Sequence, residues 1–453
     1  MEKGEIDFGR ERIDTIFRKM FFPTLTGMAS IALMCVIDGI FVSHGVGARG
    51  VAAVNFCNPV YSVMSAIGLM MGLGSSVVAS IHFSHEKEKD ANLNITQGFA
   101  FAALCGIVLV AALLLFRRPL ARALGAEESM VEMVAAYMCG LAPAIFFDLT
   151  KTVCMFAIRL DGSPKYAMMA NVVPALINIF LDWLFIFPMG MGVFGAALAT
   201  TAGIFSGWVM AVFYMLKLSG KVHFQMPKRS LKSLRLSIRN IGYQCKLGFG
   251  SFVGEICGGV YSVVGNLVFM KYLGTVGVGA FGIVCYYNPL LFMIGYAIVN
   301  SMQPVISFNY GLGDGARVRR STFKCFHVGG LTALAITVLF VFFPKPLIEL
   351  FLPVSDPSAA LALEGFPLFG AGMLFYMCNI IAIGYFQSIE RPALATVGSV
   401  LRGVVFVIPA FLLLPIWWGA AGMWLVLPIC EVLTSILLVV PFIKSLDYGR
   451  KNQ

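Results

Sequence analysis

Long apolar stretches separated by short polar ones cover nearly the whole chain. A helix that crosses a bilayer needs about 20 mainly apolar residues, because each residue adds about 1.5 Å and the hydrocarbon core is about 30 Å thick. Backbone polar groups must be satisfied inside the segment in lipid, so such spans are helices. The pattern predicts an all-α polytopic membrane protein with twelve transmembrane helices, at residues 17–43, 51–82, 93–116, 131–158, 166–187, 193–216, 248–270, 278–308, 324–343, 363–388, 393–414 and 419–443.

A polar, basic stretch at 217–247 separates the first six spans from the last six. It predicts an N-terminal lobe at 1–216, a cytoplasmic linker at 217–247 and a C-terminal lobe at 248–453. The lobes share weak, ordered self-similarity at an offset of 227 residues. The matches pair Gly27 with Gly254, Gly47 with Gly274, Gly50 with Gly277, Val51 with Val278, Ala53 with Ala280 and Ser80 with Ser307; Asn58-Pro59 recurs as Asn288-Pro289, and Gly195–Ala197 recurs as Gly419–Ala421.

Because each lobe has an even number of spans, both lobes enter and leave the membrane on the same side. Their relation is therefore an axis along the membrane normal, which gives two pseudo-symmetric six-helix bundles. That arrangement favours a transporter that works by alternating access over a channel, which is more often assembled from copies around a pore.

The composition excludes soluble classes of protein. Hydrophobic residues make up 59% of the chain and charged residues only 12%, where soluble domains average about 25% charged. A mean hydropathy of +0.85 indicates an apolar outer surface. Neither a soluble enzyme nor a nucleic-acid-binding protein has this balance, and the chain contains no H-E-x-x-H, no G-x-S-x-G and no nucleophile with a paired base. We expect no enzyme activity and no cofactor.

The net charge of +10 has a topological explanation. If the N-terminus is cytoplasmic, 25 Lys and Arg residues lie on the cytoplasmic side and 6 on the other, so the positive-inside rule places both termini in the cytoplasm. The first twenty residues carry five basic and five acidic residues and no cleavage site, so they do not form a signal peptide. We expect a multi-pass protein of the cell (inner) membrane, active as a monomer among membrane lipids.

The linker has the densest positive charge. Residues 217–246 carry eight basic side chains and no acidic one: Lys217, Lys221, Lys228, Arg229, Lys232, Arg235, Arg239 and Lys246. A partly amphipathic basic segment of this kind can lie on the anionic inner leaflet. Equally, it can serve only to enforce the topology.

Ionisable residues inside spans are functional candidates, because they are costly in lipid unless paired or hydrated. By helical rise, Asp38 lies about 32 Å along span one and Asp182 about 24 Å along span five, with Asn178 one turn below Asp182. Thr200 lies about 10 Å below the outer surface in span six. All four would lie in the outer half of the N-terminal lobe, where they could share a proton or bind a bare Na⁺ through oxygen atoms. The alternative is that the two aspartates only brace the lobe.

The other charged residues in spans suggest mainly structural roles. Asp148 and Lys151 are three residues apart and can form an ion pair on one helix face. Glu255, Arg402 and Glu431 could form one midplane group, in which Arg402 needs at least one carboxylate partner. Glu255 is equally consistent with bracing and with contact to a substrate or cation.

Aromatic and metal-binding side chains complete the candidates. Tyr137, Phe146, Tyr261 and Tyr287 would suit a lipophilic cation if they face a binding cleft. The five histidines are scattered, so no metal site is expected beyond transient Na⁺ at Asp38, Asn178, Asp182 and Thr200.

The chain resembles the multidrug and toxic compound extrusion (MATE) family over nearly its whole length. The resemblance rests on V-I-D-G-I-F-V at 36–42 followed by Gly47, Ala53 and Pro59, on R-L-D-G-S-P at 159–164, on I-N-I-F-L-D-W-L-F-I at 177–186, on G-V-F-G-A-A-L-A-T at 192–200, and on Y-L-G at 272–274 with P-V-I-S-F-N-Y-G at 304–311. It is greatest to the bacterial branches that carry an aspartate in span one.

The resemblance implies two six-helix bundles that export cationic amphipathic drugs in exchange for H⁺ or Na⁺. It also implies that Asp38, Asn178, Asp182 and Thr200 form the cation site. Some members use acids in spans seven and ten; Glu255 could match the first, but no acid stands near Met377–Asn379 for the second.

Two other kinds of transporter fit less well. A lipid-linked oligosaccharide flippase of the same superfamily needs free basic residues for a pyrophosphate. Away from the span ends, only Lys151 and Arg402 lie within spans, each with a candidate acidic partner. A major facilitator transporter would carry a basic Gly-Asp signature between spans two and three, which is absent here.

Overall fold

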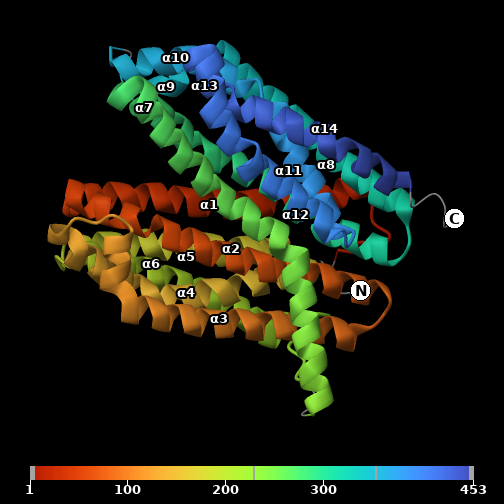
Figure 1. Ribbon diagram of the computed structural model, residues 1–453. Coiled ribbons are helices and arrows are strands. Elements are labelled where there is room, and N and C mark those ends of the chain that lie inside the picture. Colours follow the sequence, from red (N-terminus) through yellow and green to blue (C-terminus); the bar gives the residue numbers. More distant parts are fainter. Residues whose placement is uncertain (1–5, 228–229, 352, 354, 448–453) are drawn as a thin grey trace. The chain divides into compact units, whose positions relative to one another are not determined.

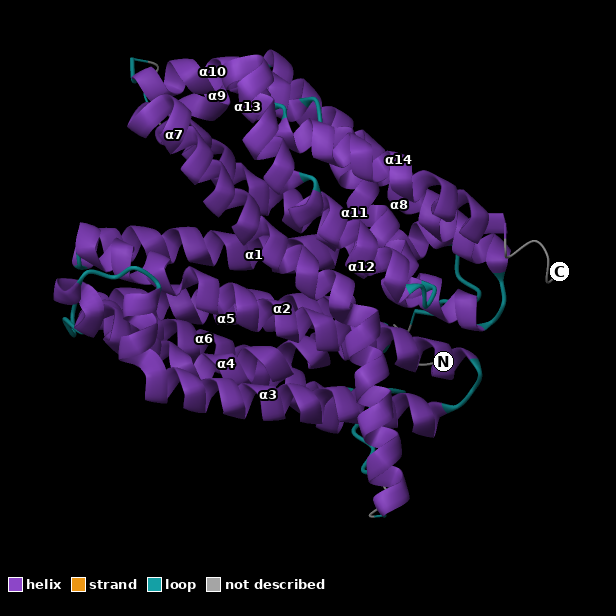
Figure 2. Ribbon diagram, viewed as in Figure 1, coloured by secondary structure: helices purple, strands orange, loops and turns teal. Residues whose placement is uncertain are grey.

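The computed structural model describes residues 6–227, 230–351, 353 and 355–447. All regular secondary structure in these residues is helical, as Figure 2 shows. The chain divides into two compact units, one ending at Gly248 and the other beginning at Phe249. The predicted all-α class with two like halves is confirmed.

Unit 1 contains six long helices and the start of a seventh. They are α1 (Ile13–Gly45), α2 (Ala48–Ser84), α3 (Glu88–Ala123), α4 (Val131–Leu160), α5 (Pro164–Ile186) and α6 (Gly192–Phe213), which continues as a π-helical turn at Tyr214–Leu218. A 3₁₀ turn at Glu128–Met130 precedes α4.

Unit 2 contains most of α7 (Leu231–Gly311) and all later helices. These are α8 (Gly315–Phe342), the short α9 (Pro344–Glu349), α10 (Pro357–Gly370), α11 (Met373–Ser388), α12 (Pro392–Val400), α13 (Val407–Trp424) and α14 (Val426–Asp447), with a π-helical turn at Leu401–Val405 between α12 and α13.

The number of spans depends on two broken helices. Among the described residues, ten helices are long and apolar enough to cross a bilayer, or eleven if α10 and α11 count as one bent span. The 81-residue α7 is far too long for one span and is interrupted at Gly274, between the predicted spans 248–270 and 278–308. If α7 counts as two spans and α10 with α11 as one, the total equals the twelve predicted spans. The predicted span at 363–388 is not one continuous helix, because α10 and α11 meet at an angle of 50°.

Backbone conformations repeat between the two units. Residues with positive φ recur at an offset of 227 or 228: Gly47 and Gly274, Glu86 and Gly313, Gly162 and Glu390, and Gly192 and Gly419. Such φ values are favourable mainly for glycine, which explains why the sequence match was visible at turns. The predicted match of Gly195 with Gly419 was wrong by three residues, because the backbone pairs Gly419 with Gly192.

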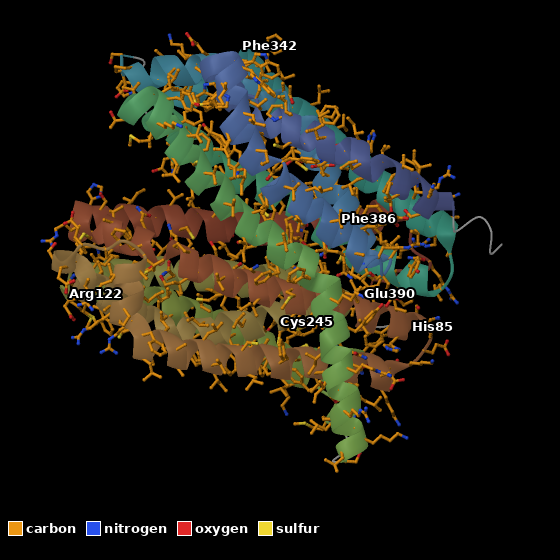
Figure 3. The ribbon with its side chains drawn as sticks, viewed as in Figure 1. His85, Arg122, Cys245, Phe342, Phe386 and Glu390 are labelled. Atoms are coloured by element: carbon orange, nitrogen blue, oxygen red, sulfur yellow. The ribbon has the colours of Figure 1, made fainter. Side chains whose placement is uncertain are left out.

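In unit 1, α4 packs against α2, α3 and α6, while α1 packs along α5 (Figure 1). The core consists of small and apolar side chains such as Met138, Leu141 and Ala197. Figure 3 labels Arg122 at one end of this bundle and His85 at the other, so the loops fall into two groups at opposite ends of unit 1.

In unit 2, α11 packs against α8, α12 and α14, and α10 packs against α8. Its core is more aromatic, with Phe340, Phe366 and Phe369 in mutual ring contact. Phe342 and Glu390 mark opposite ends of this unit in Figure 3.

Candidate cation-binding site in unit 1

Helices α5 and α6 bring an amide and a hydroxyl together. Asn178 on α5 donates from Nδ2 to Thr200 Oγ1 on α6, at 3.4 Å, and Thr200 Oγ1 donates to the Ala196 carbonyl at 3.1 Å. The helices can approach closely here because of Gly203, where an added Cβ would lie 2.9 Å from Asn178 Cβ. The polar pair is therefore set by the packing of α5 on α6.

Asp182 lies one turn beyond Asn178 on the same face of α5 and is fully buried, with 0% exposure. Among the described residues, neither of its carboxylate oxygens has a hydrogen-bond partner, and Asp38 Oδ1 on α1 is likewise buried without one. The two acids are close enough for their charges to interact. Burial of a carboxylate without a partner is strongly unfavourable, so this arrangement requires a cation or a proton.

Tyr137 on α4 faces the same region. It is 5% exposed, packs in the core of unit 1, and lies within electrostatic range of both Asp38 and Asp182. Tyr137 therefore belongs to the acidic site and does not line an exposed aromatic surface. Helices α1, α4, α5 and α6 together supply two carboxylates, an amide oxygen, a threonine hydroxyl and a phenol.

The oxygen atoms of this site suit either of two small cations. A proton can be shared between neighbouring carboxylates, and a hard cation such as Na⁺ takes carboxylate, amide and hydroxyl oxygens as ligands. Asn178 Oδ1 is also buried without a partner among the described residues, so it remains able to accept a bond. The site thus has more acceptor atoms than donors.

The buried acid of unit 2 is arranged differently. Glu431 is 2% exposed and accepts from Arg402 Nη2 at 2.6 Å and from Arg402 Nε at 3.0 Å. Asn379 Nδ2 donates to Glu431 Oε2 at 2.7 Å, and the guanidinium of Arg402 lies 4.6 Å from the centre of the Tyr376 ring. The prediction that Arg402 has a carboxylate partner is confirmed.

The sequence did not reveal the neutral members of this cluster. Ser435 donates to Asn379 Oδ1 at 2.9 Å, which orients the amide towards Glu431. Ser435 lies one helical turn after Glu431, so the i, i+4 spacing of two polar residues in an apolar helix was an available signal. Asn379 and Tyr376 lie on another helix, α11, and nothing local marks them.

Glu255 lies on α7 and is partly buried. Within the described part of the chain it makes no ion pair, because Arg402 pairs with Glu431. The midplane group of three charged residues is therefore a pair plus a separate acid.

The other aromatic candidates lie in packed surroundings. Tyr287 donates from its hydroxyl to the Leu347 carbonyl at 2.9 Å and contacts the rings of Phe340, Phe351 and Phe366. Tyr261 is buried against Phe281 and Phe411, and Phe146 contacts Phe147 and Trp208.

The predicted ion pair on α4 is confirmed. Lys151 Nζ lies 2.8 Å from Asp148 Oδ1, and both side chains are mostly buried, at 10% and 13% exposure. Lys151 is therefore neutralised within its own helix.

Two like halves of six spans, with an unpaired acidic site in one of them, define a polytopic membrane protein of the transporter type. The chain matches the MatE family twice, over residues 23–184 and 251–412, and it belongs to that family. The two matched ranges correspond to the two structural repeats.

Individual relatives and structures agree with this assignment. The chain is 22% identical to "Multidrug export protein MepA" of Staphylococcus saprophyticus, over 95% of both chains. It is 26% identical to "FAD transporter" of Shewanella oneidensis, over 94% of this chain and 93% of the relative. A MOP superfamily transporter from Pyrococcus furiosus has the same fold, with a TM-score of 0.90 at 18% identity over 99% of both chains.

Proposed function

We propose that this protein is a cation-coupled antiporter that exports lipophilic organic cations, with both termini in the cytoplasm and with H⁺ or Na⁺ as the coupling ion. We further place it in the bacterial branch with an aspartate in span one, here Asp38. The observation that carries the proposal is Asp182, a fully buried carboxylate without a hydrogen-bond partner in the described chain, beside Asp38. The name of the MepA relative supports export of drugs.

Coupling follows from the unfavourable burial of these acids. When the site is open to a medium rich in H⁺ or Na⁺, the cation binds to Asp38 and Asp182 and neutralises them. Neutral acids tolerate a closed, dry environment far better than charged ones. Occupation of the site therefore favours a different conformation from the empty site, which is the condition for ion-driven alternating access.

Helix α1 carries the conformational step in this proposal. Pro23 lies inside α1, where the proline ring removes one backbone hydrogen bond and weakens the helix. Asp38 lies fifteen residues further on, about 22 Å along the helix. Neutralisation of Asp38 lets α1 bend near Pro23, and this bending expels the drug.

The charge balance in the spans favours a cationic cargo. Lys151 and Arg402, the two basic residues furthest from the ends of the predicted spans, are both neutralised by acids. An anionic cargo, such as the FAD named for one relative or the pyrophosphate of a lipid-linked oligosaccharide, would lack a free basic partner there. Glu255 makes no ion pair within the described part of the chain, and in this proposal it contacts a cationic cargo or a second coupling ion.

Transport in proteoliposomes tests the proposal. The purified protein is reconstituted, loaded with a fluorescent lipophilic cation such as ethidium, and given either a proton gradient or a Na⁺ gradient alone. One of the two gradients should drive transport, and that gradient identifies the coupling ion. Asp38→Asn and Asp182→Asn should each lower coupled transport by about 100-fold while the protein stays folded.

A matched control separates loss of coupling from general damage. Glu364→Gln removes an exposed carboxylate from α10 of unit 2, and we expect it to transport like the wild type. If Asp38→Asn also transports like the wild type under both gradients, the proposed coupling site is wrong. If FAD is transported and ethidium is not, the proposed class of cargo is wrong, but the proposed coupling site is not contradicted.

A further inference from the structure

The first turns of α7 present an exposed basic face that the transport proposal does not use. Lys232, Arg235, Arg239 and Lys246 lie on this part of the helix, and all four are exposed. We call these four residues the basic face. In Figure 1 the first turns of α7 extend beyond the other helices of unit 1.

The opposite side of the same helix is fixed to unit 1. Gln97 Nε2 donates to Ser237 Oγ at 2.8 Å, and Gln244 Nε2 donates to the Asn94 carbonyl at 3.0 Å. Cys245 Sγ lies 3.4 Å from the Met71 sulfur, and Figure 3 labels it where α7 crosses unit 1. The basic face therefore sits on an anchored helix.

The backbone requires this close contact. An added Cβ at Gly74 would lie only 2.8 Å from the Gln244 carbonyl carbon, and one at Gly248 would lie 2.6 Å from the Met70 carbonyl carbon. The chain before α7 is also held, because Asp161 accepts backbone bonds from Lys221 and Val222 at 2.9 and 3.0 Å. Residues 220–227 and 230–248 are thus held against the helices of unit 1.

The spacing of residues gives the helix three different sides. At about 100° per residue, Ser237, Ile241, Gln244 and Gly248 share the side that faces unit 1. The four residues of the basic face point about half a turn away from that side. Leu231, Leu234 and Ile238 form a stripe about a quarter turn from both.

The apolar stripe is uncovered. Leu231 is 87% exposed, Leu234 58% and Ile238 63%. Leucine and isoleucine side chains beside a row of basic ones are typical of helices that lie at a membrane surface, with the apolar side chains at the acyl boundary and the basic ones among the headgroups. A nucleic acid would leave the apolar stripe without a partner.

The positive charge of the basic face has no compensation within the described chain, since none of its four residues makes an ion pair there and residues 217–246 contain no acid. The opposite end of unit 1 differs. There Arg122 pairs with Glu128 at 2.7 Å, and Arg118 pairs with Glu132 at 2.8 Å. Basic side chains are thus present at both ends, but two of those at the opposite end are neutralised by acids of unit 1, whereas none of the basic face is.

We propose that the basic face and the adjacent apolar stripe bind anionic phospholipid headgroups of the cytoplasmic leaflet, with the phosphates on Lys232, Arg235 and Arg239 and the acyl chains along Leu234 and Ile238. Each basic side chain near an anionic membrane surface contributes about a five-fold gain in affinity. Three of them give about 100-fold. The proposal does not depend on which compound is transported.

Native mass spectrometry of the full-length protein tests this binding. The protein in neutral detergent is titrated with phosphatidylglycerol or phosphatidylcholine, and the lipid retained per protein is measured. We expect phosphatidylglycerol to bind the wild type, and the Lys232→Gln/Arg235→Gln/Arg239→Gln variant to lose about 100-fold in affinity. Phosphatidylcholine should bind both weakly and alike.

Matched variants make the result decisive. Arg118→Gln/Arg122→Gln removes two basic residues that already have acidic partners, and it should bind phosphatidylglycerol like the wild type. Lys232→Arg/Arg235→Lys/Arg239→Lys keeps the charge and should bind normally, so it serves if the neutral variant fails to fold. Leu234→Ser/Ile238→Ser should weaken binding without any loss of charge.

Two results would overturn the proposal. One is equal retention of phosphatidylglycerol by the wild type and by the folded neutral variant. The other is displacement of the lipid by an equal concentration of soluble glycerol phosphate, which would mean that the face recognises a free phosphate and that the apolar stripe contributes nothing.

Discussion

Each unit buries an acid in its interior, and the two units treat it in opposite ways. In unit 1, Asp182 is fully buried without a hydrogen-bond partner in the described chain, near Asp38. In unit 2, Glu431 is almost as deeply buried but is held by Arg402 and Asn379. Arg402 is in effect a cation tethered to the protein. An acid with a tethered cation is satisfied permanently, whereas we propose that the acid without one exchanges a mobile cation with the medium.

The comparison also explains why substitutions at the two sites should have different effects. Removal of Arg402 leaves a buried charge without a partner, which is a loss of stability. Removal of the charge at Asp182 removes an unfavourable buried charge, so the free energy of unfolding should not fall. Transport should be lost instead. Stability and transport are therefore the two measurements that separate the units.

The largest effect is expected for Arg402→Met. Breaking a buried ion pair by removing one partner typically costs about 3–5 kcal/mol, so the free energy of unfolding should fall by that amount. Replacing both partners, as in Arg402→Met/Glu431→Leu, should recover most of the loss, because no buried charge remains. Unfolding in mixed micelles with increasing denaturant measures both. An equally large loss in the double variant would show that packing and not charge is responsible.

Asp38→Asn and Asp182→Asn should lower coupled transport by about 100-fold, which corresponds to about 2.7 kcal/mol. Their thermal stability should stay at or above that of the wild type, because an amide is less costly to bury than an unpaired carboxylate. Transport under an imposed gradient, measured beside thermal unfolding, checks both expectations. A strongly destabilised Asp182→Asn protein would instead indicate that this acid braces the bundle.

Thr200→Ala should weaken binding of the coupling cation by up to about ten-fold, because it removes one acceptor and the partner of Asn178, and a single hydrogen bond contributes about 0.5–1.5 kcal/mol. Thr200→Ser keeps the hydroxyl and should behave like the wild type. The half-saturating concentration of H⁺ or Na⁺ for transport gives the measurement. If Thr200→Ala and Thr200→Ser have the same half-saturating concentration, the Thr200 hydroxyl does not bind the coupling cation.

The smallest effect is expected for Tyr287→Phe. It deletes the hydroxyl that donates to the Leu347 carbonyl and should cost about 1 kcal/mol of stability. If Tyr287 only braces α7 against α9, the apparent affinity for each of several cationic dyes should not change. A shift for some dyes and not others would place Tyr287 in contact with the cargo.

Prediction from sequence worked best where the deciding property is local. Hydrophobic length located most of the spans, and the three-residue spacing of Asp148 and Lys151 on one helix predicted their ion pair. It did not place the exact point at which the helix 363–388 breaks, although Pro367 lies inside α10. The bend between α10 and α11 falls at Ala371 and Gly372, where Gly372 packs against Pro428 of α14, so the break depends on a distant segment.

The acidic site of unit 1 was accessible through depth, since helical rise places Asp38, Asp182 and Thr200 at a similar level. Depth cannot say which faces of the helices meet. The approach of α5 to α6 at Gly203 decides that Asn178 reaches Thr200. Similarly, Glu255 and Glu431 were both possible partners for Arg402, and only the packing of the helices selected Glu431.

The sequence by itself determined that this protein lies in a membrane, that its helices form two like halves, and which few charged residues lie in lipid. Those properties follow from the length and composition of each segment, because lipid forces every apolar span to satisfy its own backbone. Only the tertiary structure decided which of the buried acids has a tethered cation and which does not. That difference depends on side chains from separate helices meeting at one point, and no local pattern in the chain encodes such a meeting.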